Sequence, residues 1–261
     1  MSDAIVFEDV QVTVASAGRI LGPVSLRVGA GERWALLGPN GSGKTTLLSV
    51  AGAWRQPSSG RAWVLGAELG RVDVRDLRTR IGHVGHTLTE KMRTGLSVRD
   101  VVLTGRTSVL ETWFQTFTQA ERDDADARLA QMGCLAMAER PLFTCSQGER
   151  ARVYLARALF GRRELLLFDE PAAGLDLPAR EQLVTAMESA GAEGITSVLA
   201  THHLEEIPPG TTHAALLAAG SVVAAGPVGV VLSGELLSDA FGIEVAVERR
   251  NGRWTAFASG S

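Results

Sequence analysis

The chain has little cysteine, and this excludes two common ways of stabilising a small protein. Only Cys134 and Cys145 occur among its 261 residues, and they form no Cys-x-x-Cys pair. A disulfide framework needs several paired cysteines, and a structural zinc site needs clustered cysteine or histidine ligands. We therefore expect a fold stabilised by a hydrophobic core, which a chain of this length can bury as one large domain.

An excess of charge of either sign is also missing. Charged residues make up 21% of the sequence, and the formal net charge is -3. Proteins whose main partner is nucleic acid usually carry a clear basic balance or patch. The Arg-Arg pairs at 162–163 and 249–250 are short, and a solvated surface explains both. The composition therefore predicts no nucleic-acid partner.

Long apolar segments are scarce as well. The N-terminus has no basic region followed by an apolar core, so we expect no signal peptide. The range 214–234 carries no charge and has the length of a membrane span. It contains turn residues at Gly220-Ser221 and Gly226-Pro227, however. We therefore predict two short strands of a hairpin over 215–218 and 222–224, and a cytoplasmic protein.

What the sequence does contain is a glycine-rich loop that fits the phosphate-binding pattern G-x-x-x-x-G-K-[ST]. Apolar residues precede it at 34–37 and follow it at 47–50, which predicts a strand, a loop and a helix. Lys44 is expected to reach the β- and γ-phosphates of a nucleotide, and Thr45 to bind Mg²⁺. The predicted nucleotide-binding residues here are Gly38, Pro39, Asn40, Gly41, Ser42, Gly43, Lys44, Thr45 and Thr46.

Two carboxylates follow the apolar run at 165–168. Asp169 and Glu170 come directly after this predicted buried strand. An Asp at such a strand end can hold Mg²⁺ at the edge of an α/β sheet, and this order of residues is the Walker B form. Glu170, one residue further, would face the γ-phosphate and act on the attacking water.

A helix with a capped start provides a second possible anion site. Ser146 and Glu149 have the spacing of a capping box, and an amphipathic helix follows. Ser146, Gly148 and the helix N-terminus can together bind an anion. Two phosphate sites for one triphosphate would be redundant in a monomer. They are explained if the second site serves the nucleotide of a partner chain.

The order of patterns predicts the fold class. Alternating strands over 10–14 and 24–28 suit an antiparallel sheet with one solvated face, and the apolar runs at 165–168 and 196–200 suit buried parallel strands. The range from about 88 to 163 is mainly helical. We predict an α/β P-loop NTPase with a mainly parallel core sheet flanked by helices, an N-terminal antiparallel β layer and a helical lobe. Residues 1–235 would form this domain, and 236–261 a small appendage of unassigned function.

Taken together, these motifs resemble the ATP-binding subunit of an ABC transporter, over nearly the whole chain. The segments that carry the resemblance are the P-loop at 38–45, the signature at 145–149, Walker B ending at 169–170, the D-loop at 174–176 and a switch histidine, His202. The resemblance implies ATP and Mg²⁺ as cofactors. It also implies a second ATPase subunit, identical or paralogous, an integral-membrane permease, and a location on the cytoplasmic face of the cell membrane.

The resemblance also implies roles for single residues. Glu170 would be the general base, with Lys44 and His202 as further catalytic residues that contact the γ-phosphate. Thr45 and Asp169 would bind the metal. The partner's nucleotide would be contacted by the signature residues Ser146, Gln147, Gly148 and Glu149.

Three departures from the family pattern stand out. The signature is usually Leu-Ser-Gly-Gly-Gln, whereas Cys145, Gln147 and Glu149 replace three of its residues here. His86 stands where the Q-loop glutamine is normal, as a weak metal-ligand candidate with Thr87 as the alternative. The adenine-stacking aromatic is missing from the range 14–19, where Arg19 would either stack or be solvated.

The transported solute and its direction are open at this stage. A single compact cassette resembles importer subunits, and residues 31–34 are similar to metal- or oxyanion-import types. The alternative is a soluble ABC ATPase that acts on DNA or ribosomes. Such proteins usually carry two cassettes or a long coiled-coil insert, and this chain has neither. A P-loop GTPase is disfavoured because no Asn-Lys-x-Asp occurs.

Overall fold

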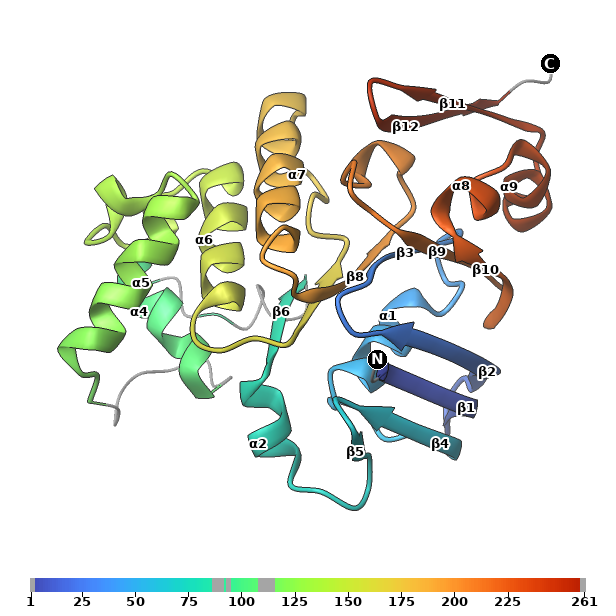
Figure 1. Ribbon diagram of the computed structural model, residues 1–261, viewed down its shortest axis with the longest axis horizontal. Helices are drawn as coiled ribbons and strands as arrows, with labels where there is room; N and C mark the ends of the chain where they lie inside the picture. The colour runs from blue at the N-terminus through green and yellow to red at the C-terminus, as the bar shows by residue number, and fades with distance from the viewer. Residues whose placement is uncertain (1–2, 86–91, 93–94, 108–115, 259–261) are drawn as a thin grey trace.

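The computed structural model describes residues 3–85, 92, 95–107 and 116–258. Within them a six-stranded core sheet has a smaller β layer on one side and a helical lobe on the other (Figure 1). The strands of the core sheet, in spatial order, are β10 (Ser221–Pro227), β9 (His213–Ala218), β3 (Arg33–Leu37), β8 (Thr196–Thr201), β7 (Leu165–Asp169) and β6 (Ile81–Gly85).

The core sheet is mainly parallel, as predicted. Strands β9, β3, β8, β7 and β6 run parallel to their neighbours, and only β10 pairs antiparallel with β9. Every residue of β7 is buried, as expected of a strand covered on both faces. The predicted hairpin is confirmed as β9 and β10. Among the described residues, no helix is long and apolar enough to cross a membrane.

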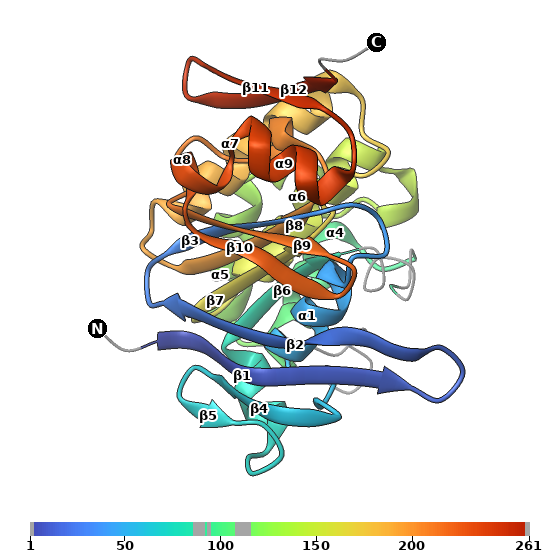
Figure 2. The same cartoon turned by 90° about the vertical axis from the view of Figure 1, so that its right-hand side faces the viewer.

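The second sheet is antiparallel and forms the predicted N-terminal layer. Its spatial order is β2 (Gly18–Gly29), β1 (Asp3–Val14), β4 (Ser59–Val64) and β5 (Ala67–Glu68). Figure 2 shows this layer below the core sheet, with α1 (Lys44–Ala51) between them. Side chains of both sheets and of α1 share one hydrophobic cluster, which fixes the P-loop between the two layers.

The lobe is helical, as predicted. Its elements are α4 (Val98–Leu103), the 3₁₀ turns η1 (Thr104–Thr107), η2 (Leu135–Met137) and η3 (Leu142–Thr144), and the helices α5 (Gln119–Gln131) and α6 (Gln147–Leu159). The predicted capping box of Ser146 with Glu149 starts α6, and a second one, of Thr118 with Glu121, starts α5. The lobe packs against α7 (Leu177–Gly191), while α2 (Val74–Thr79) precedes β6.

The C-terminal part returns to the core sheet. After α8 (Val228–Val231) and α9 (Gly234–Phe241), a hairpin forms from β11 (Val245–Arg250) and β12 (Arg253–Ala258). Its two-residue turn, Asn251-Gly252, has φ values of 51° and 79°, which suits a type I′ hairpin turn. Trp254 is buried in one cluster with Leu37 of β3. The boundary at 235 stays a prediction.

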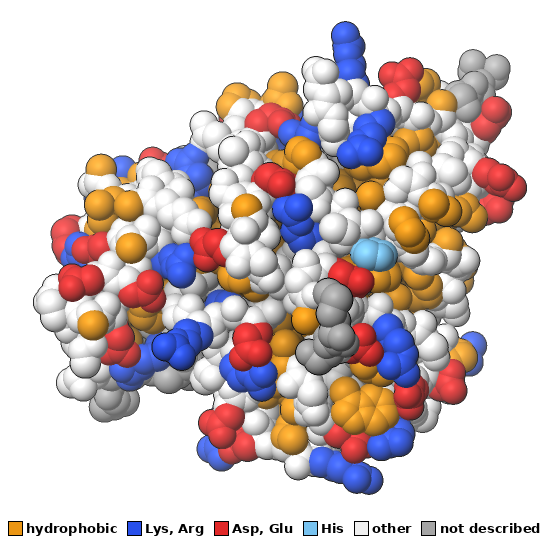
Figure 3. All heavy atoms as spheres, viewed as in Figure 1, with side chains coloured by type: hydrophobic (Ala, Val, Ile, Leu, Met, Phe, Trp, Pro, Cys, Tyr) orange, Lys and Arg blue, Asp and Glu red, His pale blue; other side chains and the backbone are white. Residues whose placement is uncertain are grey.

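The surface mixes charges of both signs. On the face in Figure 3, acidic and basic side chains are interspersed over the lobe and the core. Apolar side chains gather on the same face near α8 and α9. Exposed apolar residues in this part of the chain are Val223, Val230, Ile243 and Phe257.

Candidate nucleotide-binding site

The P-loop connects β3 to α1 through a backbone that only glycine can adopt at two points. Gly38 has a φ of 150°, and a Cβ there would lie 2.1 Å from the carbonyl oxygen of Leu217. Gly43, the N-cap of α1, has a φ of 101°. Because neither position tolerates a side chain, the loop can wrap closely around an anion at the helix N-terminus.

Inside this loop, Ser42 provides a polar group without a partner. Its side chain is buried, and its Oγ makes no hydrogen bond with the described residues. Buried hydroxyls are almost always hydrogen-bonded in native proteins. A hydroxyl left unpaired in a loop of this shape fits a phosphate oxygen, so the residues present suit a nucleotide.

Lys44 is the buried cation of the site. Its side chain is 4% exposed, and Nζ donates to the carbonyl oxygens of Gly38 at 2.8 Å and Pro39 at 3.0 Å. Burial lowers the pKa of Lys44, and the nearby carboxylates of Glu170 and Asp169 act in the opposite direction. The ammonium group is therefore held within the loop by its carbonyl oxygens.

Thr45 and Asp169 meet across the gap between α1 and β7. Thr45 Oγ1 donates to Asp169 Oδ1 at 2.9 Å, and Asp169 is buried. A hydroxyl and a carboxylate oxygen are ligands that Mg²⁺ accepts in nucleotide sites. The pair predicted as metal ligands is thus adjacent, 124 residues apart in sequence.

Glu170 lies between two predicted catalytic side chains. Its Oε1 is 3.8 Å from Lys44 Nζ and 3.2 Å from His202 Nδ1. Its φ of 48° lies in the left-handed region, where residues other than glycine are uncommon, and its N–H donates to the carbonyl oxygen of Ala200. This backbone conformation and that bond fix the direction in which the carboxylate leaves β7.

Strand order explains why these side chains meet. In the core sheet β8 lies between β3 and β7, and all three run parallel. Leu37 pairs with Thr201, and Asp169 pairs with Ala200, so the carboxyl ends of the three strands lie at one edge. Ligand sites of α/β sheets form at this edge.

A contact that the sequence analysis did not identify shapes the turn around His202. Thr201 Oγ1 donates to the buried carboxylate of Glu206 at 2.5 Å and accepts from the His203 N–H at 3.0 Å. The rings of His202 and His203 lie 4.0 Å apart. The sequence signal for this contact was Thr201, a polar residue at the end of an apolar strand. The functional assignment went instead to the histidine that follows it.

The signature residues lie in a separate cleft. Ser146 Oγ accepts from the Glu149 N–H at 3.2 Å, and Glu149 Oε2 accepts from the Ser146 N–H at 2.7 Å. They line a cleft of about 400 Å³ together with Gln147, Gly148, Gly174, Leu175 and Asp176. None of the residues that line it comes from the P-loop. The structure therefore brings the signature and the D-loop together, apart from Lys44.

Some predicted residues lie elsewhere. His86 and its alternative Thr87 are outside the described residues. Arg19 is exposed on β2, opposite Thr13. Its neighbour Ile20, which the sequence analysis passed over, is closer to the loop: the Ile20 carbonyl oxygen would lie 3.4 Å from a Cβ at Gly43.

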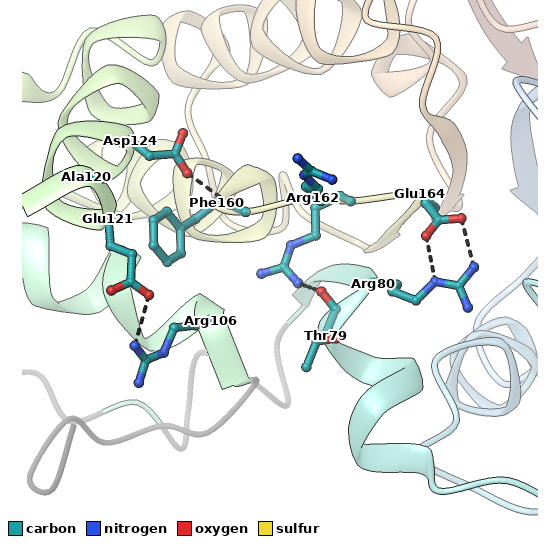
Figure 4. Close-up of a pocket in the computed structure, with 11 residues that line it drawn as sticks. Thr79, Arg80, Arg106, Ala120, Glu121, Asp124, Phe160, Arg162 and Glu164 are labelled. Atoms are coloured by element: carbon teal, nitrogen blue, oxygen red, sulfur yellow. Dashed lines mark hydrogen bonds and ion pairs between the residues drawn. The ribbon is translucent and has the colours of Figure 1, made fainter. Parts of the chain in front are cut away.

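A cavity of about 520 Å³ lies away from this site (Figure 4). In its wall Arg80 pairs with Glu164, and Arg106 pairs with Glu121. Arg80 and Glu164 stand just before β6 and β7 begin, which is the opposite end of these strands from Glu170. The cavity therefore takes no part in the phosphate site.

Known proteins are similar to this chain in sequence and in fold. The model of the ABC transporter family matches residues 21–173. The chain is 37% identical over 231 residues to the uncharacterized ABC transporter ATP-binding protein YlmA of Bacillus subtilis, covering 87% of each chain. It is 36% identical over 218 residues to the cobalt import ATP-binding protein CbiO of Rhodobacter capsulatus, covering 82% of this chain and 75% of that protein.

A solved structure has the same fold. It is the dimeric post-hydrolysis state of the ATP-binding cassette MJ0796 bound to ADP and Pi, with a TM-score of 0.74 and 23% identity, covering 86% of this chain and 98% of that one. The family match spans more than half of this chain, and both relatives cover most of it. The chain therefore belongs to the ABC transporter family, as an ATP-binding subunit with ATPase activity.

Proposed function

We propose that this chain dimerises head-to-tail around two ATP molecules and powers the import of a solute through a separate membrane permease. The observation that carries the proposal is the position of Glu170, whose carboxylate lies 3.8 Å from Lys44 Nζ and 3.2 Å from His202 Nδ1. A general base must lie within reach of the water that attacks the γ-phosphate, and Lys44 and His202 are the two residues proposed to contact that phosphate.

Binding is the task of the P-loop. Its backbone N–H groups and Lys44 hold the β- and γ-phosphates, and the unpaired Ser42 hydroxyl donates to a phosphate oxygen. Thr45 and Asp169 hold Mg²⁺, which neutralises phosphate charge when bound. Their direct hydrogen bond at 2.9 Å supports this pairing, because it places the two oxygens next to each other.

Hydrolysis is the task of the other two side chains. Glu170 accepts a proton from the attacking water, and His202 donates a hydrogen bond to the γ-phosphate. The left-handed backbone of Glu170 and the contacts of Thr201 hold these groups in place. Such preorganisation avoids reorganising the site during the reaction.

The dimer completes the site. The cleft between α6 and the D-loop faces the partner's triphosphate, and the signature residues Ser146, Gln147, Gly148 and Glu149 contact it there. ATP bridges the two chains and hydrolysis removes the bridge, so nucleotide biases an equilibrium between open and closed dimers. The MJ0796 cassette, whose solved structure is dimeric with ADP and Pi bound, supports the formation of a dimer.

The permease receives this motion at the cytoplasmic face of the cell membrane, where we place the chain as a peripheral subunit. Similarity to the cobalt importer CbiO supports metal import, with oxyanions as the other class. Residues 1–235 would form the ATPase domain, and 236–261 the appendage.

Purification with the membrane partner tests the proposal. The full chain carries an affinity tag and is purified from its own cells in mild detergent, with an untagged strain as the control. We expect a multi-span membrane protein to copurify in stoichiometric amount. Ribosomal proteins or DNA in its place would contradict the transport function and favour the soluble ATPase. Cobalt uptake by cells with and without the gene then tests the cargo.

A further inference from the structure

The C-terminal hairpin contacts two segments that border the phosphate site. Arg253 begins β12, and its Nη1 and Nη2 lie 2.6 Å and 3.2 Å from the two carboxylate oxygens of Glu181 on α7. Nη2 also donates to the carbonyl oxygen of Glu205, in the turn η4 (Leu204–Glu206). One guanidinium group therefore contacts both helix α7 and the turn η4, which are separate segments of the sequence.

Both connected segments lead to functional residues. The η4 turn comes directly after His202 and His203. Helix α7 begins directly after the D-loop residue Asp176. Gln182, which follows Glu181 on α7, accepts a hydrogen bond from Arg152 of α6. Helix α6 is the helix that begins at the signature. A continuous series of contacts thus runs from η4 through Arg253 and α7 to the signature helix.

The hairpin holds Arg253 firmly. Trp254, the adjacent residue, is buried in one cluster with Leu204 and Ile207 at the two ends of η4. In the hairpin turn, a Cβ at Gly252 would lie 3.7 Å from Pro209. Figures 1 and 2 show the hairpin at the upper end of the molecule, above α9. Because the residues on either side of Arg253 are packed, its planar guanidinium is held where it can bind two partners at once.

We propose that Arg253 is a positioning residue of the ATPase: it couples the η4 turn, which follows His202 and His203, to α7, and so gives the C-terminal appendage a function. The inference rests on the role proposed above for His202. Lysine could not replace arginine fully, because one ammonium group cannot bind a carboxylate with two parallel bonds and a carbonyl as well.

The effect should appear in catalysis more than in stability. The side chains of Arg253 and Glu181 are 26% and 42% exposed, and exposed ion pairs contribute little to folding. Small displacements of a catalytic group, in contrast, slow turnover. We expect Arg253→Met to lower kcat about threefold to tenfold. The KM for ATP should stay unchanged, because the hydrogen bonds of Arg253 go to α7 and η4 and not to the phosphate-binding loop.

The test compares four variants of the full chain: Arg253→Met, Arg253→Lys, Glu181→Gln and the double variant Arg253→Met with Glu181→Gln. The matched control is Arg249→Met, because Arg249 lies over the Trp254 ring at 5.0 Å and belongs to the same hairpin. Steady-state kcat and KM are measured, together with hydrogen–deuterium exchange of the peptide 202–209. Melting temperatures monitor folding.

We expect Arg253→Met to lower kcat and speed exchange in 202–209, Arg253→Lys to restore part of both, and the double variant to lose less than the sum of the single losses. Arg249→Met should leave kcat and exchange as in the wild type. Equal kcat for the Arg253 and Arg249 variants, or unchanged exchange, would overturn the inference. His202→Ala separates the two proposals: normal turnover in that variant rejects the role of His202, whatever Arg253 does.

Discussion

The two anion sites of this chain are built in opposite ways. In the P-loop, Ser42 Oγ is buried and has no hydrogen-bond partner among the described residues, while the Lys44 ammonium is buried against loop carbonyls. At the start of α6 the polar groups already satisfy each other, since Ser146 and Glu149 cap one another on an exposed surface.

This difference indicates how each site is used. A loop with an unpaired hydroxyl and a desolvated cation binds phosphate by itself, and it gains from doing so. The start of α6 has its capping groups paired with each other, so it loses no hydrogen bond when no ligand is bound. It also carries the Glu149 carboxylate, which opposes anion binding. The first site is therefore expected to bind nucleotide in the monomer, and the second only when a partner presents it.

The largest effect is expected from a substitution that stops hydrolysis at the P-loop site but leaves ATP binding intact. Glu170→Gln removes the base but keeps the size of the side chain, so kcat should fall at least about 100-fold, with ATP retained in a trapped dimer. Turnover and gel filtration with ATP measure both outcomes. The matched control is Glu164→Gln at the other end of β7, which breaks only the surface pair with Arg80. Normal turnover in Glu170→Gln would reject the general base.

A smaller effect tests whether the second site acts in trans. Ser146→Arg places a bulky cation in the cleft, and we expect turnover to fall about tenfold or more while the monomer still binds ATP. Thr118→Arg is the matched control, because Thr118 starts α5 with the same capping box. Both variants should lose similar stability. If they also had similar ATPase rates, the signature helix would have no special role.

The smallest effect concerns the charge of Glu149. The Ser146 backbone N–H lowers the pKa of this carboxyl, so its contribution to stability is present above the ordinary glutamate pKa and is lost as pH falls through the lowered value. Glu149→Gln should therefore cost less than about 1 kcal/mol at pH 7 and nothing at low pH. Removing the charge should raise turnover.

The control for this substitution lies in the other capping box. Glu121→Gln removes a carboxyl whose pKa Arg106 and the Thr118 N–H lower to about 2. It should show a similar pH-dependent loss in denaturant unfolding curves but no change in ATPase rate. A turnover increase in both variants would show that the charge at α6 is not what matters.

Local patterns in the sequence predicted much of the fold. The residues 34–37 and 165–168 lie in β3 and β7, and the predicted capping box at Ser146 formed, because strand burial and helix starts depend on neighbouring residues. The strand predicted over 10–14 is part of a longer strand, β1, which begins at Asp3. Asp9 has a φ of 50° and lies where the register shifts, so the chain continues through a bulge.

The sequence by itself determined the P-loop, because its glycines and its lysine have functions that depend only on the adjacent backbone. It also determined that carboxylates and a histidine follow buried strands. Only the tertiary structure decided that Glu170 lies within 4 Å of both Lys44 and His202, because strand order, which joins distant segments, sets that distance. The contact of Arg253 with α7 and η4 likewise depends on packing of the last hairpin, and no local pattern encodes it.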